Sequence, residues 1–483
     1  MSELERVAAE WKSKPRSESG AYYDKEVIPR VMDLVVPRER NKLKLTDGPG
    51  YEGLILSLGQ SPEPLAISIA VWQPQRILLL VTKESRTFLD RVLELARIPY
   101  SKVDVQEIDS VDTNRFYIEV KKAYQRWDRP TNVAIDITGG TKAMVAAAAL
   151  AANVLKFDVV YVKSEYLKEY GHPEPGTETV VRLDNPLNVF GDLEFQTAQR
   201  LAEERQDYGG AARLLEDLSK VVEGENSLVY GIWAKLYRAY EAWDQLDVKL
   251  ALDYMEESER GLNQHGGLPS LAPLKSQRER LTKQKQALRL MAEELPHGEK
   301  SLAVERLANP AIASAILATV YHMALRRKAS GRLDMATLLW YRLLEMLEQT
   351  VLATLGVDTS APDYPRLAHS LGISVDKLLQ NYNEQRSEIK RGLVHELPSP
   401  IALIDGYILL AALGKPLYPD HLGKLVGRVA QRNFSIFAHG YSFISLESSE
   451  KLHKEVELIL DKFIHYVDLD RQSWDEMAFL SKA

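Results

Sequence analysis

Residues 132–144 have the sequence Asn132-Val-Ala-Ile-Asp-Ile-Thr-Gly-Gly-Thr-Lys-Ala-Met144. The apolar, largely β-branched run 133–137 is typical of a strand that is buried on both faces. The two glycines that follow allow a sharp turn and a close approach to a ligand. The Ala-, Leu- and Met-rich segment from Lys142 to Leu155 predicts a helix. The unpaired N–H groups and the positive dipole end of a helix N-terminus at such a turn suit a phosphate.

The spacing of these residues does not by itself identify a ligand. It matches neither the phosphate-binding loop G-x-x-x-x-G-K-[ST] nor the dinucleotide fingerprint G-x-G-x-x-G. The local sequence therefore fits both an anion-binding site and a tight structural turn.

Further strands are predicted on both sides of this stretch, at 54–58, 76–82, 103–108 and 158–162, and the run 76–82 reads as buried. Helical segments at 65–72, 85–96 and 114–127 separate them. This alternation predicts an open parallel sheet with helices on both faces, in which ligands bind beyond the carboxyl ends of the strands. Gly59, Gln60 and Ser61 follow the first strand, so we expect them to line the same site as residues 138–142.

Two segments of this predicted sheet resemble a known family. Asp136-Ile-Thr-Gly-Gly-Thr-Lys-Ala-Met144 and the loop Ser57-Leu-Gly-Gln-Ser-Pro62 are similar to the ligand loops of CARF domains, the Rossmann-like sensors of cyclic oligoadenylates in type III CRISPR systems. The resemblance implies a cyclic oligoadenylate activator, with the tetra-adenylate favoured over the hexa-adenylate. The implied ligand residues are Gly59, Gln60, Ser61, Thr138, Gly139, Gly140, Thr141, Lys142 and Met144.

Near the C-terminus, residues 432–440 have the sequence Arg432-Asn-Phe-Ser-Ile-Phe-Ala-His-Gly440. In one continuous helix, a spacing of seven places Arg432 and His439 on the same face. That face would also hold Lys424, Arg428 and Ser435, and the apolar back would hold Val426, Ala430, Phe434 and Phe437. We expect the helix to stop at Gly440, with His439 in its last turn. The alternative interpretation is a solvated amphipathic helix with incidental charges.

Two other segments have a similar Arg–His spacing. Arg260-Gly-Leu-Asn-Gln-His265 lies in a stretch that we expect to interrupt the helical pattern, and Arg391-Gly-Leu-Val-His395 is one residue too tight. Neither offers an apolar back and a basic front on one predicted helix.

Segment 432–440 resembles the R-x(4–6)-H motif of HEPN ribonucleases. Metal-free RNA cleavage uses the ribose 2′-OH as the nucleophile, so the substrate is expected to be single-stranded RNA. His439 would transfer protons and Arg432 would stabilise charge on the phosphate. Asn433 and Ser435 would orient these groups, and Lys424 and Arg428 would bind RNA. No metal is expected in the site, and no cofactor is expected for catalysis.

Arg432 and His439 would lie about 10 Å apart along the helix axis, too far to flank one phosphorus atom comfortably. Two copies that face each other across a two-fold axis solve this problem, so we expect a homodimer with a composite active site, as the resemblance also implies.

The predicted fold class is α/β plus all-α, in four parts. Residues 1–45 form a helical extension of two helices, 46–185 the Rossmann-like CARF domain, 186–305 a helical linker domain, and 306–483 the α-helical HEPN domain. The linker's aromatic residues are expected in its core rather than at an RNA surface: Trp233, Tyr237, Tyr240 and Trp243.

Composition restricts the other possibilities. The chain has 483 residues, no cysteine and a net charge of −7, which excludes disulfides, thiolate metal sites and a broadly basic nucleic-acid surface. The first residues lack an apolar signal core and no apolar run is long enough to span a bilayer, so we expect a cytoplasmic protein without membrane association. The rival class is a sensor that regulates through DNA binding or as a scaffold, without nuclease activity.

Overall fold

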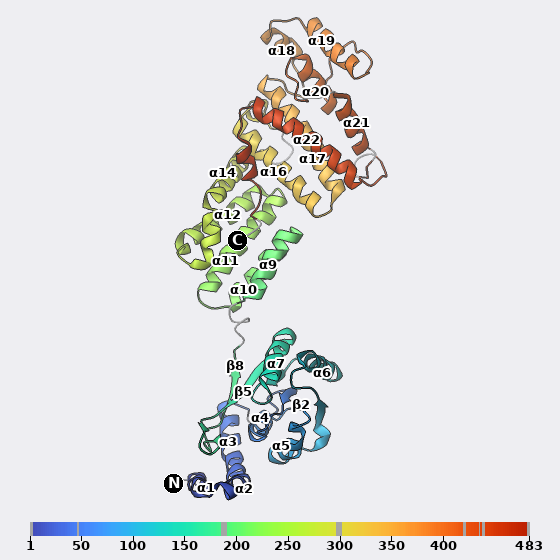
Figure 1. Ribbon diagram of the computed structural model, residues 1–483. Coiled ribbons are helices and arrows are strands. Elements are labelled where there is room, and N and C mark those ends of the chain that lie inside the picture. The colour runs from blue at the N-terminus through green and yellow to red at the C-terminus, as the bar shows by residue number, and fades with distance from the viewer. Residues whose placement is uncertain are drawn as a thin grey trace. The chain divides into compact units, whose positions relative to one another are not determined.

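The computed structural model describes residues 3–45, 48–184, 191–295, 302–418, 422–433, 435–436 and 440–480, with the backbone alone for 431–433. The chain divides into two compact units, residues 1–189 and 190–483. The first is built on a β-sheet and the second is helical (Figure 1). The predicted fold class is confirmed. The predicted domain bounds inside each unit stay predictions.

A six-stranded sheet forms the centre of the first unit. Its order is β3 (Val103–Glu107), β2 (Arg76–Val81), β1 (Gly53–Ser57), β4 (Val133–Asp136), β5 (Asp158–Lys163) and β8 (Thr179–Leu183). The first five strands are parallel, and β8 is antiparallel to β5. The parallel strands confirm the prediction within about one residue. For β1, β2 and β4 the reason is that strands buried on both faces have continuous apolar sequences.

The sequence did not predict the strands after β5. The region from about residue 165, expected to be an inter-domain connection, contains β8 and the small hairpin β6 (Tyr166–Leu167) with β7 (His172–Pro173). Strands of two residues leave no periodic pattern. β8 is at the sheet edge, so it lacks a long apolar run.

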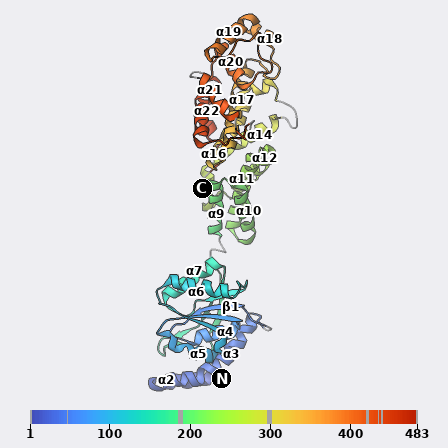
Figure 2. The same ribbon diagram turned by 90° about the vertical axis from the view of Figure 1, so that its right-hand side faces the viewer.

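Helices cover both faces of the sheet (Figure 2). The helices α3 (Ile28–Lys42), α4 (Glu63–Trp72) and α5 (Leu89–Ala96) pack with Leu54 and Leu56 of β1. On the other face, α6 (Thr113–Arg126) and α7 (Lys142–Leu155) pack with Ile55 of the same strand. This alternation follows from the two-residue period of a strand.

The N-terminal extension contains three helices rather than the two expected. These are α1 (Glu3–Ser13), α2 (Arg16–Tyr22) and α3, with a π-helical turn at Tyr23–Val27 joining the last two. Trp11 and Tyr23 are buried with the sheet residues. Arg38 of α3 donates to the carbonyl of Gly176 over 2.7 Å, and the extension is thereby fixed to the sensor unit.

The second unit contains helices throughout its described residues. They are α9 (Asp192–Arg205), α10 (Tyr208–Val221), α11 (Glu225–Asp244), α12 (Val248–His265), α13 (Ala272–Ser276), α14 (Arg278–Glu294), α15 (Val304–Leu307), α16 (Pro310–Ala329), α17 (Leu333–Thr354), α18 (Tyr364–Ser370), α19 (Val375–Glu388), α20 (Leu403–Ala412), α21 (Leu422–Asn433), α22 (Leu446–Tyr466) and α23 (Arg471–Asp475). The four aromatic residues of α11 named above are all buried, so their predicted place in the core is confirmed.

The chain end returns to the start of this helical unit. Phe479 stacks on Tyr240 of α11 with ring centroids 4.2 Å apart. Arg280 and Gln284 of α14 donate to the carbonyl of Ala478 over 2.6 and 2.7 Å. The last described segment therefore ties the C-terminal helices to α11 and α14.

Candidate sensor and catalytic sites

The two glycine loops of the sensor unit meet at the carboxyl edge of the sheet. β1 and β4 are neighbours, with Leu56 opposite Asp136. A Cβ added at Gly59 would lie 3.0 Å from the nitrogen of Gly140, and one at Gly139 would lie 2.4 Å from the carbonyl oxygen of Ser57. Backbone packing therefore requires glycine at residue 139 and favours it at residue 59. The expected proximity of the two loops is observed.

Two threonines of the second loop use their hydroxyl groups inside the fold. Thr141 caps α7, accepting from the N–H of Met144 over 3.3 Å, and donates to the carbonyl of Ser110 over 2.8 Å. The hydroxyl of Thr138 accepts from the N–H of Val162 over 2.8 Å. These contacts fix the loop to the ends of β3 and β5 before any ligand binds.

Four of the predicted ligand residues are exposed at this edge: Gln60, Ser61, Thr141 and Lys142. Lys142 is the first residue of α7. A cation, a helix N-terminus and three polar side chains thus share one surface. Met144 is different, because it is buried in the core under α7, where helical periodicity groups it with Ala147, Ala148 and Ala151.

Asp136 is a further residue of this site that sequence reasoning did not assign. It is buried, accepts from the N–H of Thr138 over 2.7 Å and accepts from the hydroxyl of Ser68 in α4. Burial raises the pKa of the Asp136 carboxyl, although these hydrogen bonds act in the opposite direction. One carboxyl thus connects the turn after β4 to the helix that follows the first glycine loop.

Two cavities flank the sheet. One of about 340 Å³ lies beyond the carboxyl ends of β2 and β3 and is lined by Thr82, Lys83, Glu84, Glu107, Ile108, Asp109 and Ser110. This cavity lies next to the glycine loops, because the hydroxyl of Thr141 donates to the carbonyl of Ser110 in its lining. The other, of about 620 Å³, lies between α3, α4 and α5 at the amino edge of the sheet, away from the loops.

In the helical unit, the structure corrects the expected geometry of the Arg–His motif. Helix α21 ends at Asn433, and Ser435 forms a parallel bridge with Ser442. The N–H of Gly440 donates to the carbonyl of Ser435 over 3.1 Å. The premise of one helix from Lys424 through His439 is therefore wrong, and so is the expected separation along a helix axis. Asn433 and the aromatic and β-branched residues after it favour a helix end.

Parts of the motif lie outside the described residues. These are Phe434, residues 437–439 with His439, and the side chains of Arg432 and Asn433. The catalytic roles assigned to Arg432, Asn433 and His439 stay predictions. Ser435 is described, and its side chain is buried.

The buried face of α21 also differs from the expected one. Leu425 and Val429 are buried, whereas Ala430, expected on the apolar back, is exposed. Lys424 is exposed, as an RNA contact requires. Arg428 faces α22, with its Nε 4.0 Å from Oε1 of Glu455.

The rival Arg–His segments occupy ordinary structural positions. Arg260 and His265 both lie in α12, which runs unbroken to His265. The expected break in the helix at this segment is therefore wrong. Arg391 pairs with Asp405 at 3.5 Å.

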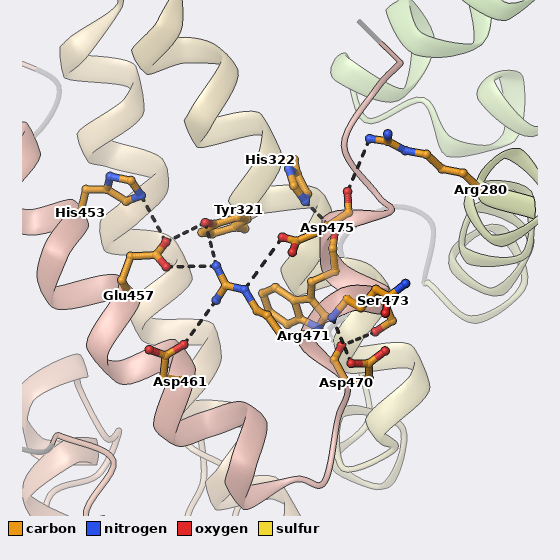
Figure 3. A network of polar contacts seen from close by, with 12 residues as sticks. Arg280, Tyr321, His322, His453, Glu457, Asp461, Asp470, Arg471, Ser473 and Asp475 are labelled. Carbon is orange, nitrogen blue, oxygen red and sulfur yellow. Dashed lines mark hydrogen bonds and ion pairs between the residues drawn. The ribbon is translucent and has the colours of Figure 1, made fainter. Parts of the chain in front are cut away.

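Two histidines near α22 belong to a structural network (Figure 3). His322 lies with Nε2 2.6 Å from the carbonyl oxygen of Trp474, and burial lowers its pKa to about 4. His453 lies with Nε2 3.2 Å from Oε1 of Glu457. Burial alone would raise the pKa of Glu457, but hydrogen bonds from His453 and Tyr321 lower it to about 2. Both histidines therefore have structural roles.

Glu348 of α17 is a buried acid that sequence reasoning missed. Neither of its carboxyl oxygens has a hydrogen-bond partner. A Cβ added at Gly406 of α20 would lie 2.2 Å from Oε2 of Glu348, so the two helices approach closely at this point. Burial raises the pKa of Glu348 well above its usual value.

Two searches were negative for the described part of the chain. Within it, no group of three or more His, Asp or Glu side chains is arranged to hold a metal ion. No helix there is long and apolar enough to cross a membrane.

The first unit is Rossmann-like and has paired glycine loops at the carboxyl edge of its sheet. The second unit is helical and contains an Arg–His motif. This is the architecture of CARF–HEPN proteins. Family models agree with this class. A model described as the Csm6 HEPN domain matches residues 307–462, and one described as the Csm6 6H domain matches residues 190–288. The chain is a CRISPR-associated CARF–HEPN protein, as the resemblance implied, and its helical unit carries the 6H and HEPN domains of Csm6.

Individual proteins are similar over different shares of the chain. The CRISPR system endoribonuclease Csm6 of Thermus thermophilus is 29% identical over 416 residues, which cover 84% of each chain. Enterococcus italicus Csm6 bound to cyclic hexa-2′-fluoro-hexa-dAMP is 10% identical with a TM-score of 0.43, covering 88% of this chain and 97% of that one. Can2 from Sulfobacillus thermosulfidooxidans in complex with cyclic tetra-adenylate is 15% identical with a TM-score of 0.22, covering 43% of this chain and 57% of that one.

Proposed function

We propose that this protein is an endoribonuclease that cyclic oligoadenylate activates in type III CRISPR antiviral defence. The observation that carries the proposal is the pair of interlocked glycine loops at the N-terminus of α7, in a chain whose helical unit matches the Csm6 HEPN domain. The Thermus thermophilus relative, an endoribonuclease, supports the same activity.

The activator site is the carboxyl edge of β1 and β4. Lys142 and the N-terminus of α7 attract the phosphates of the ring, and Gln60 and Ser61 supply hydrogen bonds. Thr138 and Thr141 hold the loop in its binding shape. Cyclic tetra-adenylate is favoured over hexa-adenylate as the activator, made by the type III complex.

The cleavage step uses the ribose 2′-OH of single-stranded RNA as the nucleophile. His439 transfers protons near neutral pH, and Arg432 stabilises the negative charge that develops at phosphorus. Asn433 and Ser435 orient these groups. No metal ion takes part in this mechanism.

The active form is a homodimer whose two HEPN motifs form a composite site. A ring of identical nucleotides has rotational symmetry, so a two-fold sensor dimer matches it. Activation requires that the ring binds the active arrangement of the dimer more tightly than the resting one.

The test is cleavage of a labelled single-stranded RNA, with and without cyclic tetra-adenylate and with EDTA throughout. We expect ring-dependent cleavage that EDTA does not prevent, and no cleavage at a position where a 2′-deoxy nucleotide replaces the ribose. Ring binding without any RNA cleavage would instead identify a regulator without nuclease activity. Loss of cleavage in EDTA would overturn the metal-free mechanism.

A further inference from the structure

Two exposed aromatic side chains directly follow the Arg–His motif. Tyr441 is 95% exposed and Phe443 is 82% exposed. Ser442, between them, pairs with Ser435 in a parallel bridge. In an extended backbone, side chains two positions apart point to the same side, and the two rings have this spacing around the bridge residue Ser442.

Hydrogen bonds hold the backbone that presents these rings. The N–H of Ile436 donates to the carbonyl of Ser442 over 3.1 Å, and the N–H of Ile444 donates to Oδ1 of Asp334 over 3.2 Å. Ser445 then caps α22 by accepting from the N–H of Ser448 over 3.1 Å. A ligand that stacks on the rings therefore orders little additional backbone.

By itself the exposed patch is smaller than a stable protein interface. Two aromatic side chains bury about 300–500 Å² together, whereas a stable interface buries roughly 800 Å² and about 20–30 residues on each side. Ile436 and Leu446 are also exposed, but four large side chains remain far below that number.

One exposed cation close to the patch suits an anionic ligand. Arg332 lies just before α17, two residues before Asp334, which accepts from the N–H of Ile444. Arg332 is exposed, and it makes none of the ion pairs found among the described residues. Aromatic rings for stacking combined with nearby cations are the usual means of binding single-stranded nucleic acid.

We propose that Tyr441 and Phe443 form a stacking platform for unpaired bases of the RNA substrate, an inference that rests on the proposed ribonuclease function. Tyr441 follows the proposed proton-transfer residue, His439, by two positions in the sequence. The platform therefore serves bases next to the scissile bond. Stacking accepts any base, so the platform selects unpaired RNA over duplex with little sequence preference.

The test compares Tyr441→Ala and Phe443→Ala with the conservative variants Tyr441→Trp and Phe443→Tyr. Each alanine variant is expected to raise the KM for RNA roughly 5- to 100-fold, with kcat within about twofold of wild type, and the aromatic variants to restore KM. The matched control is Tyr100→Ala, which removes an exposed tyrosine of the sensor unit. An RNA with abasic sites beside the scissile bond should bind wild type and alanine variants equally.

Two further readouts keep this inference separate from the proposed function. Light scattering on the same samples reports the oligomeric state, and a loss of dimer in the alanine variants would overturn the platform in favour of a protein interface. Anisotropy of a fluorescein-labelled single-stranded RNA reports binding without cleavage. If wild type does not cleave RNA, weaker binding by the alanine variants still supports the platform, and unchanged binding overturns it.

Discussion

The sensor loops and the HEPN motif differ in how their geometry is determined. In the sensor unit, residues 57–62 and 138–142 are fixed by backbone packing and by hydroxyl bonds to neighbouring strands. In the helical unit, the motif begins in the last turn of α21 and continues beyond the helix end at Asn433. The comparison shows that packing at a sheet edge specifies a ligand loop, whereas helical periodicity does not specify the backbone that follows a helix end.

The largest expected effect is at the HEPN motif. His439→Ala should lower ring-stimulated RNA cleavage by about 100- to 10,000-fold, because it removes the proton-transfer group. Ring binding should be unchanged, because the residue lies outside the sensor unit. Calorimetric titration with cyclic tetra-adenylate provides the control. Cleavage at the wild-type rate would exclude His439 from the chemistry.

In the sensor loops, we expect a substitution to weaken ring binding by a steric clash and not by removing a reactive group. Gly139→Ala forces a Cβ to 2.4 Å from the carbonyl oxygen of Ser57. We expect this substitution to destabilise the sensor unit by about 1–3 kcal/mol and to weaken ring binding by at least about tenfold. Gly20→Ala is the matched control, since an added Cβ there has open space. Equal ring affinity in the two variants would contradict the account of the loops.

The buried Glu348 should make the stability of the helical unit depend on pH. The folded-state pKa of Glu348 is raised, so the stability that the neutral acid contributes is present below its unfolded pKa and is lost as pH rises through the folded value. Glu348→Gln keeps the group neutral. Its thermal stability should therefore exceed that of wild type by a margin that grows with pH, reaching about 1–3 kcal/mol. A margin independent of pH would show that Glu348 does not titrate.

The smallest effects are expected for two cations of α21, Lys424 and Arg428, which should differ in their contribution to RNA affinity. Lys424→Ala should weaken RNA binding about two- to fivefold and reduce its salt dependence by roughly one ion. Arg428→Ala should leave RNA affinity nearly unchanged and lower stability by about 1 kcal/mol, because Arg428 lies beside Glu455. Anisotropy with labelled RNA at several salt concentrations, together with thermal unfolding, measures both. The reverse pattern would place Arg428 in the RNA site.

The sequence predicted most of the sensor fold, and its errors have identifiable physical causes. Buried parallel strands such as β1 and β4 have continuous apolar sequences, so their positions were predictable. The strands β6–β8 were not predictable, because very short and edge strands carry little periodic signal. The burial of Met144 was predictable from the helical period of α7, but the resemblance placed this residue among the ligand contacts.

In the helical unit, periodicity predicted helices but not the end of the decisive one. The regular pattern of residues 422–433 continues formally to His439, yet the chain leaves the helix at Asn433 and pairs Ser435 with Ser442. That bridge joins residues only seven positions apart, but it has no periodic sequence signal. The buried Glu348 depends on Gly406, 58 residues later along the chain.

The most direct test of the central claim is one titration in which cyclic tetra-adenylate is added to wild-type protein while ring binding and RNA cleavage are followed together. The account predicts that cleavage is nearly absent without the ring and rises in parallel with the occupancy of the sensor. Cleavage that proceeds at the same rate at every ring concentration would contradict it.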